Sequence, residues 1–111
     1  MSPYTIRFLR EAESDYSREY RWSKKQWGAA HAKDFFDKID LILRSLEDNP
    51  FLYNKHMKDG LEYRVVRMKG MHIAYHIDED KRMVTVMAFI GRNRFFELEQ
   101  MALDRTKNPR T

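Results

Sequence analysis

Three runs of β-type sequence, separated by short turns, restrict the fold of this chain more than any other feature. The runs span Leu61 to Met68, Met71 to Ile77 and Met83 to Ile90. Each is rich in β-branched, aromatic or alternating apolar residues, as strands are. Lys69-Gly70 suits a tight hairpin because Gly accepts positive φ, and the charged segment from Asp78 to Arg82 suits a second turn. The order predicts an antiparallel meander.

A short strand and two helices are predicted before these three strands. Tyr4 to Leu9, "YTIRFL", indicates a short strand, and a first helix follows from Glu11 to a stop at Gly28. Its aromatic positions Tyr16, Tyr20 and Trp27 are expected to pack on the sheet. A second helix ends before Asn49-Pro50. Its apolar positions follow the i, i+3, i+4, i+7 pattern: Ala32, Phe35, Phe36, Ile39, Ile42, Leu43 and Leu46.

The remaining segments complete one domain over residues 1–111. Residues 51–59 are interpreted as a polar connection, and Phe95, Leu98 and Ala102 favour a short C-terminal helix. A flexible tail is expected from about residue 104. The fold class is therefore α+β, in the order β-α-α-β-β-β with the short helix last. Both N-terminal helices should pack on one face of an antiparallel sheet, with the first strand at its edge.

Composition narrows the functional classes. The chain has no cysteine, which excludes a disulfide framework, a thiolate nucleophile and a Cys-based metal site. The net charge of +4 favours acidic partners such as nucleic acid or an acidic protein segment. No apolar run is long enough to cross a membrane, and no signal-peptide pattern is present, so we expect a cytoplasmic protein without a membrane partner.

The hairpin from Tyr63 to Tyr75, "YRVVRMKGMHIAY", carries an unusual number of potential cations. Period two places Ile73, Tyr75, Ile77, Val84, Val86, Ala88 and Ile90 on the helix-covered face. His72 and His76 then lie on the other face, which the N-terminal helices leave uncovered. A two-residue turn sets Arg67 opposite His72 and Tyr63 opposite His76, while Arg64 points the other way.

Such a basic face suits two kinds of chemistry. Arginines can grip phosphates while an aromatic ring stacks on a base. Alternatively, His72 and His76 could act as base and acid in RNA cleavage without a metal, with Arg67 stabilising the developing charge. A solvated strand face with surface ion pairs explains Arg64 and Arg67 equally well. The histidines lack metal-ligand spacing, so we expect neither a metal nor another cofactor.

The arrangement resembles the RelE/ParE superfamily of toxins from bacterial type II toxin–antitoxin modules. The resemblance extends over nearly the whole chain, through "YTIRFL", "LRSLEDNPF", "GLEYRVV", "HIAYHIDED" and "VTVMAFIGRNR". It implies a cognate antitoxin partner, and a basic toxin suits an antitoxin with an acidic segment that folds on binding.

Two branches of this superfamily imply different targets. The RelE-like branch cleaves messenger RNA in the ribosome; Arg64 and His72 match its strand cations, but the last strand offers no Tyr or His. The ParE-like branch acts on DNA gyrase and often ends that strand in a histidine before Gly-Arg-Arg. Here Ile90 replaces the histidine, while Gly91 and Arg92 fit.

We favour a ParE-like, growth-inhibiting toxin and keep the metal-independent endoribonuclease as the alternative. A noncatalytic module that binds nucleic acid or protein is a third hypothesis. The site residues fall into two groups. Those with catalytic potential are Arg64, Arg67, His72 and His76, and those expected to bind the target are Tyr63, Arg92 and Arg94.

Overall fold

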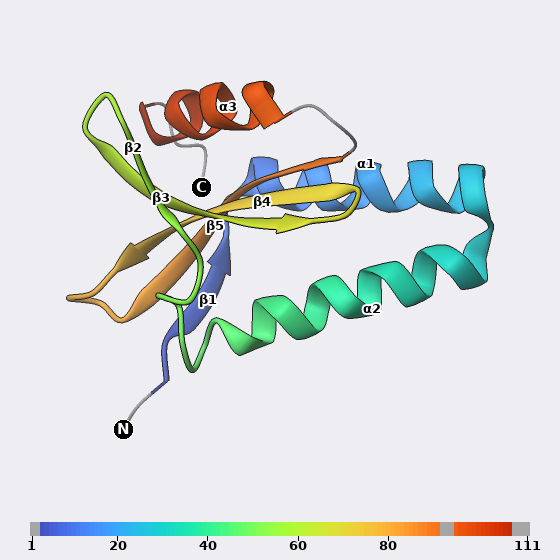
Figure 1. Cartoon of the computed structure of the whole chain (residues 1–111), viewed down its shortest axis with the longest axis horizontal. Coiled ribbons are helices and arrows are strands. Elements are labelled where there is room, and N and C mark those ends of the chain that lie inside the picture. Colours follow the sequence, from blue (N-terminus) through green and yellow to red (C-terminus); the bar gives the residue numbers. More distant parts are fainter. Residues whose placement is uncertain (1–2, 92–94, 108–111) are drawn as a thin grey trace.

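The chain forms three helices around one sheet, as a computed structural model of residues 3–91 and 95–107 describes (Figure 1). The elements in order are β1 (Thr5–Phe8), α1 (Arg10–Trp27), α2 (Ala29–Ser45), β2 (Lys55–Lys58), β3 (Leu61–Met68), β4 (Met71–Asp78), β5 (Met83–Gly91) and α3 (Phe95–Lys107). The predicted α+β class and the order of the elements are confirmed, except that β2 was not expected. Helix α3 also continues beyond residue 104, where we expected a tail to begin.

In the part of the chain that the structure describes, the sheet has five strands, in the order β1-β5-β4-β3-β2. Strand β1 forms one edge, as expected, but it runs parallel to β5, so the sheet is mixed rather than antiparallel throughout. Strand β2 forms the other edge by pairing with β3, from Lys55 opposite Arg64 to Lys58 opposite Leu61. The interpretation of residues 51–59 as a connection was therefore wrong in part. An edge strand with mostly exposed polar side chains lacks the apolar alternation by which strands are recognised.

Helices α1 and α2 form a hairpin that covers one face of the sheet, here called the helical-hairpin face. The aromatic ring of Tyr16 on α1 meets Phe36 of α2 at 5.1 Å and Phe89 of β5 at 5.4 Å, both edge-on. Gly28 joins the helices with φ +91°, a backbone region that favours glycine. Figure 1 shows the hairpin extending past the end of the β3–β4 turn. Trp27, at that end, is 45% exposed, so its assignment to the core was wrong.

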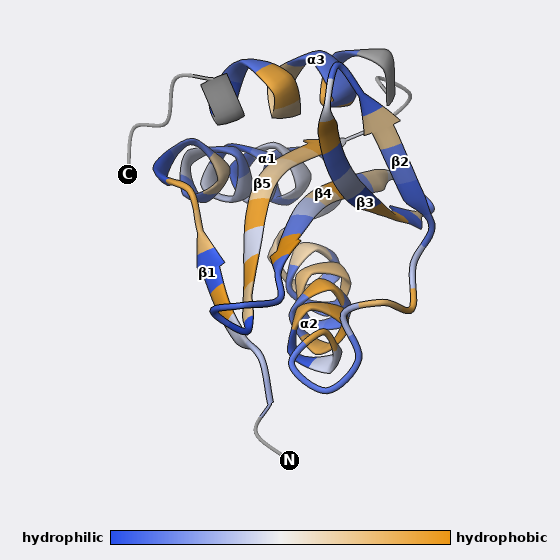
Figure 2. Ribbon diagram, turned by 90° about the vertical axis from the view of Figure 1, so that its left-hand side faces the viewer, coloured by the Kyte–Doolittle hydropathy of each residue, from blue (hydrophilic) through white to orange (hydrophobic). Residues whose placement is uncertain are grey.

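Helix α3 covers the opposite face of the sheet, here called the α3 face, which we had expected to be open. Leu98 and Ala102 of α3 are fully buried and belong to the same core as the strands. Figure 2 shows α2 and α3 on opposite sides of the strands. The physical reason is that this face also carries the buried apolar side chains of Val65, Ala74 and others, which need cover.

A β-bulge in β5 determines which of its apolar residues lie on the α3 face. Ala74 pairs with Ala88, but Tyr75 pairs with Val86, so Met87 is the extra residue. The shift reverses the parity of β5 beyond this point. Ala88 and Ile90, which we predicted on the helical-hairpin face, lie opposite Ala74 and His72 on the α3 face.

A buried ion pair holds the bulge between the two helical layers. Asp15 of α1 is 1% exposed and accepts hydrogen bonds from the Phe89 N–H at 3.1 Å and from Arg105 of α3 at 2.5 Å and 3.2 Å. Arg105 also donates to the Met87 carbonyl at 2.9 Å. The pair therefore ties α1, the bulge and α3 together.

The described helices do not include one with both the length and the apolar character that a bilayer span requires.

Candidate functional site on the central hairpin

The predicted site residues of β3 and β4 divide between the two faces of the sheet. Arg67 pairs directly with His72, as predicted, and both lie on the α3 face. Arg64 pairs with Tyr75, a core residue of the helical-hairpin face, so it points the other way, also as predicted. The hairpin therefore brings Arg67 and His72 together but places Arg64 on the opposite face of the sheet.

Tyr63 lies under α3. Its side chain is 1% exposed, and its hydroxyl donates a 2.6 Å hydrogen bond to Glu99 Oε2. The imidazole of His56 on β2 stacks against its ring at 5.3 Å. Burial, then the Glu99 carboxylate, raise the pKa of Tyr63 well above its usual range. In this conformation the ring is not presented for stacking on a base.

Glu99 is the residue of this site that sequence reasoning missed. It accepts the Tyr63 hydrogen bond and pairs with Lys58 Nζ at 3.2 Å, so it links α3 to β3 and β2. These contacts, the Tyr63 bond first, lower the pKa of the Glu99 carboxyl. No local pattern identifies Glu99, because its partners are distant in sequence and β2 itself was not predicted.

Arg64 contacts the connection between α2 and β2. Its Nη1 donates to the Tyr53 carbonyl at 2.6 Å and to the Phe51 carbonyl at 3.3 Å, and its guanidinium lies 5.3 Å from the centre of the Phe51 ring. These contacts fix a segment that has little secondary structure of its own. Arg64 therefore has a structural use in this conformation, on the face away from His72.

Arg67 and His72 form the candidate pair that most resembles a reactive site. Arg67 is exposed and His72 is half-buried, on neighbouring strands. Burial, and then the Arg67 charge, lower the pKa of His72 below its usual range. A neutral imidazole beside an arginine is the result at neutral pH. In such a pair the neutral His72 imidazole can accept a proton, and the Arg67 guanidinium, which alone carries charge, can bind an anion.

His76 lies at the outer end of β4, opposite Thr85 of β5 and half-buried. Its Nδ1 is 3.0 Å from the Glu62 carbonyl oxygen, so this nitrogen carries the proton and donates it. Arg92 and Arg94 lie outside the described residues. Within the described ranges, no group of His, Cys, Asp and Glu is arranged to hold a metal ion.

The sequence matches one protein family over most of its length. The family model describes the ParE toxin of the type II toxin–antitoxin system parDE, and it matches residues 6–95, from β1 to the start of α3. The chain belongs to the ParE toxin family. It is therefore the toxin component of a type II toxin–antitoxin system, within the RelE/ParE superfamily that the sequence resembled.

Solved structures with the same fold include other toxins of this superfamily. One is the toxin–antitoxin complex RelBE2 from Mycobacterium tuberculosis, at 19% identity and a TM-score of 0.57, covering 83% of this chain and 94% of that one. Another is E. coli RelE in the free state, as a mutant with two arginines changed to alanine. That comparison gives 17% identity and a TM-score of 0.59, covering 93% of this ParE-family chain and 97% of RelE. At such identities the likeness establishes the fold alone. No curated protein matches the chain.

Proposed function

We propose that this ParE-family toxin stops bacterial growth by binding DNA gyrase in the cytoplasm, and that it does so without cleaving RNA. The observation that carries the proposal is the placement of the hairpin cations. Arg64 is held by the carbonyls of Tyr53 and Phe51 on one face, while Arg67 and His72 lie on the other. The family match to ParE, whose branch the sequence also favoured, points in the same direction.

Metal-free cleavage of RNA requires a base, an acid and a cation that converge on one phosphate. The α3 face supplies Arg67 as the cation and neutral His72 as a base. His76, the other candidate, already donates its Nδ1 proton to the Glu62 carbonyl. Tyr63 is buried against Glu99. This arrangement favours a docking surface over a nuclease centre.

We further propose that a cognate antitoxin with an acidic segment neutralises the toxin. The chain carries a net charge of +4, which complements such a segment. The RelBE2 structure, which has the same fold, is that of a toxin–antitoxin complex. An acidic segment that orders on binding would gain favourable charge pairs to offset its lost entropy.

A supercoiling assay tests the proposed target. Purified gyrase is incubated with relaxed plasmid, ATP and increasing amounts of the toxin, and the plasmid topoisomers are separated. We expect the toxin to inhibit supercoiling, and Arg67→Ala to weaken this effect. The matched control is Arg21→Ala, which removes an exposed arginine of α1 on another surface. Full gyrase activity at a large excess of toxin would refute the gyrase target.

One observation favours the RelE-like endonuclease as a second candidate, namely that Arg67 and neutral His72 are direct cross-strand neighbours. This alternative predicts cuts in translated messages that both His72→Ala and Arg67→Ala abolish, while circular dichroism shows that the variants remain folded. Primer extension on messenger RNA detects such cuts. Cleavage that persists in both variants would reject it.

A further inference from the structure

A groove lies between the end of the helical hairpin and the β3–β4 turn. It has a volume of about 480 Å³ and is lined by Trp27, His31, Phe35, Lys38, Met68, Lys69 and Gly70. Apolar side chains from α1, α2 and β3 contribute to it, and Phe35 Cζ lies close under Gly70 of the turn. Here we call it the Trp27 groove. None of the lining residues takes part in the Arg67–His72 site.

Trp27 presents a large aromatic surface in a fixed position. It is 45% exposed, although it contacts three other rings: Trp22 at 5.4 Å, His31 at 5.2 Å and Phe35 at 6.1 Å. These contacts hold the indole at the corner that Gly28 makes between the helices. A partner that covers Trp27 therefore gains apolar burial without paying the entropy of ordering the side chain.

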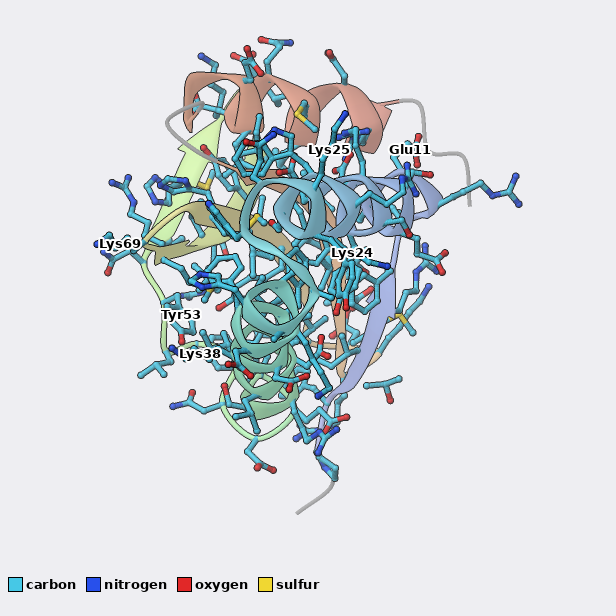
Figure 3. All side chains as sticks on the ribbon, turned by 90° about the vertical axis from the view of Figure 1, so that its right-hand side faces the viewer. Glu11, Lys24, Lys25, Lys38, Tyr53 and Lys69 are labelled. Atoms are coloured by element: carbon cyan, nitrogen blue, oxygen red, sulfur yellow. The ribbon has the colours of Figure 1, made fainter. Side chains whose placement is uncertain are left out.

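The lining is basic as well as aromatic. Lys38 of α2 and Lys69 of the β3–β4 turn belong to the groove, and both are exposed. Figure 3 looks at this end of the molecule and shows Lys38 and Lys69 on the same side of the helical hairpin, whereas Lys24 lies toward its other side and Lys25 above it. Among the described residues, those that line the groove include no carboxylate. An occupant with negative charge is therefore favoured on this rim.

We propose that the Trp27 groove binds an acidic segment of the cognate antitoxin, with a large apolar side chain seated against Trp27, Phe35 and Met68. The inference rests on the proposed antitoxin pairing and adds the place and chemistry of one contact. Carboxylates flanking the anchor would pair with Lys38 and Lys69. An aromatic anchor surrounded by complementary charge is a typical hot-spot arrangement in protein interfaces.

Single-stranded nucleic acid would use the same residue types differently. It requires a basic track along its backbone and several rings that stack on successive bases. The groove instead has one exposed indole, an apolar floor and two lysines at its rim. These features favour a protein segment, and the experiment includes an oligonucleotide to check this.

Trp27 fluorescence provides a direct readout, because the chain has only two tryptophans. In the full chain with Trp22→Phe, emission reports Trp27 alone. The probes are the whole protein encoded by the reading frame beside the toxin gene, overlapping synthetic peptides from it, and an oligothymidine. We expect the whole protein and one acidic peptide to shift the Trp27 emission to shorter wavelength. Lys69→Glu should weaken the binding of the whole protein and of the acidic peptide by about tenfold each.

The matched control is Lys81→Glu. Lys69 and Lys81 are exposed lysines in the turns at opposite ends of β4, so both substitutions change the net charge equally. We expect Lys81→Glu to leave binding within about twofold of the parent. Trp27→Ala should weaken binding by about thirtyfold or more, and Trp27→Phe by less; isothermal titration calorimetry measures both, because these variants lack the fluorescent reporter.

The other outcomes distinguish a failure of the groove proposal from a failure of the proposed antitoxin pairing. If the neighbouring protein binds but the Trp27 emission is unchanged, and Lys69→Glu behaves like Lys81→Glu, the groove proposal is wrong while the antitoxin pairing stands. If the neighbouring protein does not bind at all, both fail. If only oligothymidine shifts the emission, the groove is a nucleic-acid site and the proposal is again wrong.

Discussion

Replacing Arg105 with alanine should destabilise the toxin more than any single surface substitution. Arg105 is 16% exposed and Asp15 is 1% exposed, so the substitution leaves a buried carboxylate without its main cation. It removes two hydrogen bonds to Asp15 and one to the Met87 carbonyl in the β5 bulge. Breaking a buried pair in this way costs about 3–5 kcal/mol.

Two remaining contacts place the expected cost at the lower end of that range. Asp15 keeps the Phe89 N–H at 3.1 Å and Arg18 at 2.8 Å. We therefore expect a loss of about 3 kcal/mol in the free energy of unfolding. For a domain of this size that corresponds to a decrease in Tm of roughly 12 °C.

Urea unfolding monitored by far-UV circular dichroism measures this loss. The matched control is Arg18→Ala, which removes the other arginine bound to Asp15. Arg18 is 51% exposed, so we expect a cost of about 0.5 kcal/mol. If Arg105→Ala costs no more than Arg18→Ala, the buried pair does not stabilise the contact of α3 with the bulge, and the reasoning fails.

Three further predictions concern the close contacts and the titrating groups. Gly91→Ala should cost about 1–3 kcal/mol, because its Cβ would collide with the carboxylate of Glu19, which is itself buried; an unchanged urea midpoint would contradict this. Tyr63→Phe should cost about 1.5 kcal/mol by removing the bond to Glu99. Since the pKa of Tyr63 is raised, mainly by burial, the stability it contributes is complete below about pH 10 and is lost as the pH rises further, and Tyr63→Phe should remove that alkaline loss in pH-dependent melting. The pKa of His72 is lowered, mainly by burial, so the stability that His72 contributes is present above about pH 6.5 and is lost as the pH falls. His72→Gln should therefore reduce the loss of Tm at acidic pH. An unchanged acidic loss would show that His72 does not cause it.

Local sequence patterns predicted most of the fold. The strands β3, β4 and β5 fall within a residue of the predicted bounds, because alternating apolar residues and turn glycines mark their ends. The Arg67–His72 pairing followed from the length of the Lys69-Gly70 turn alone. The apolar periodicity also predicted helix α2, and most of its apolar stripe is buried in the structure.

Features that depend on distant contacts were missed. The bulge at Met87 follows no local sequence signal, yet it moved Ala88 and Ile90 to the other face. The cover of that face by α3 depends on contacts such as Tyr63 with Glu99 and Asp15 with Arg105, which are 36 and 90 residues apart. The lowered pKa of His72 could not be predicted from the sequence, for a related reason. Its pKa is set by burial that only the folded chain creates.

The most direct test of the proposed mechanism is to induce the toxin in a bacterial host without its antitoxin. Growth, the topology of a reporter plasmid and the 5′ ends of translated messages are followed in the same culture. The proposed mechanism predicts growth arrest, an altered topoisomer distribution and intact messages. Arrest with codon-phased cuts and unchanged plasmid topology would contradict it and establish a RelE-like nuclease on this ParE-family fold.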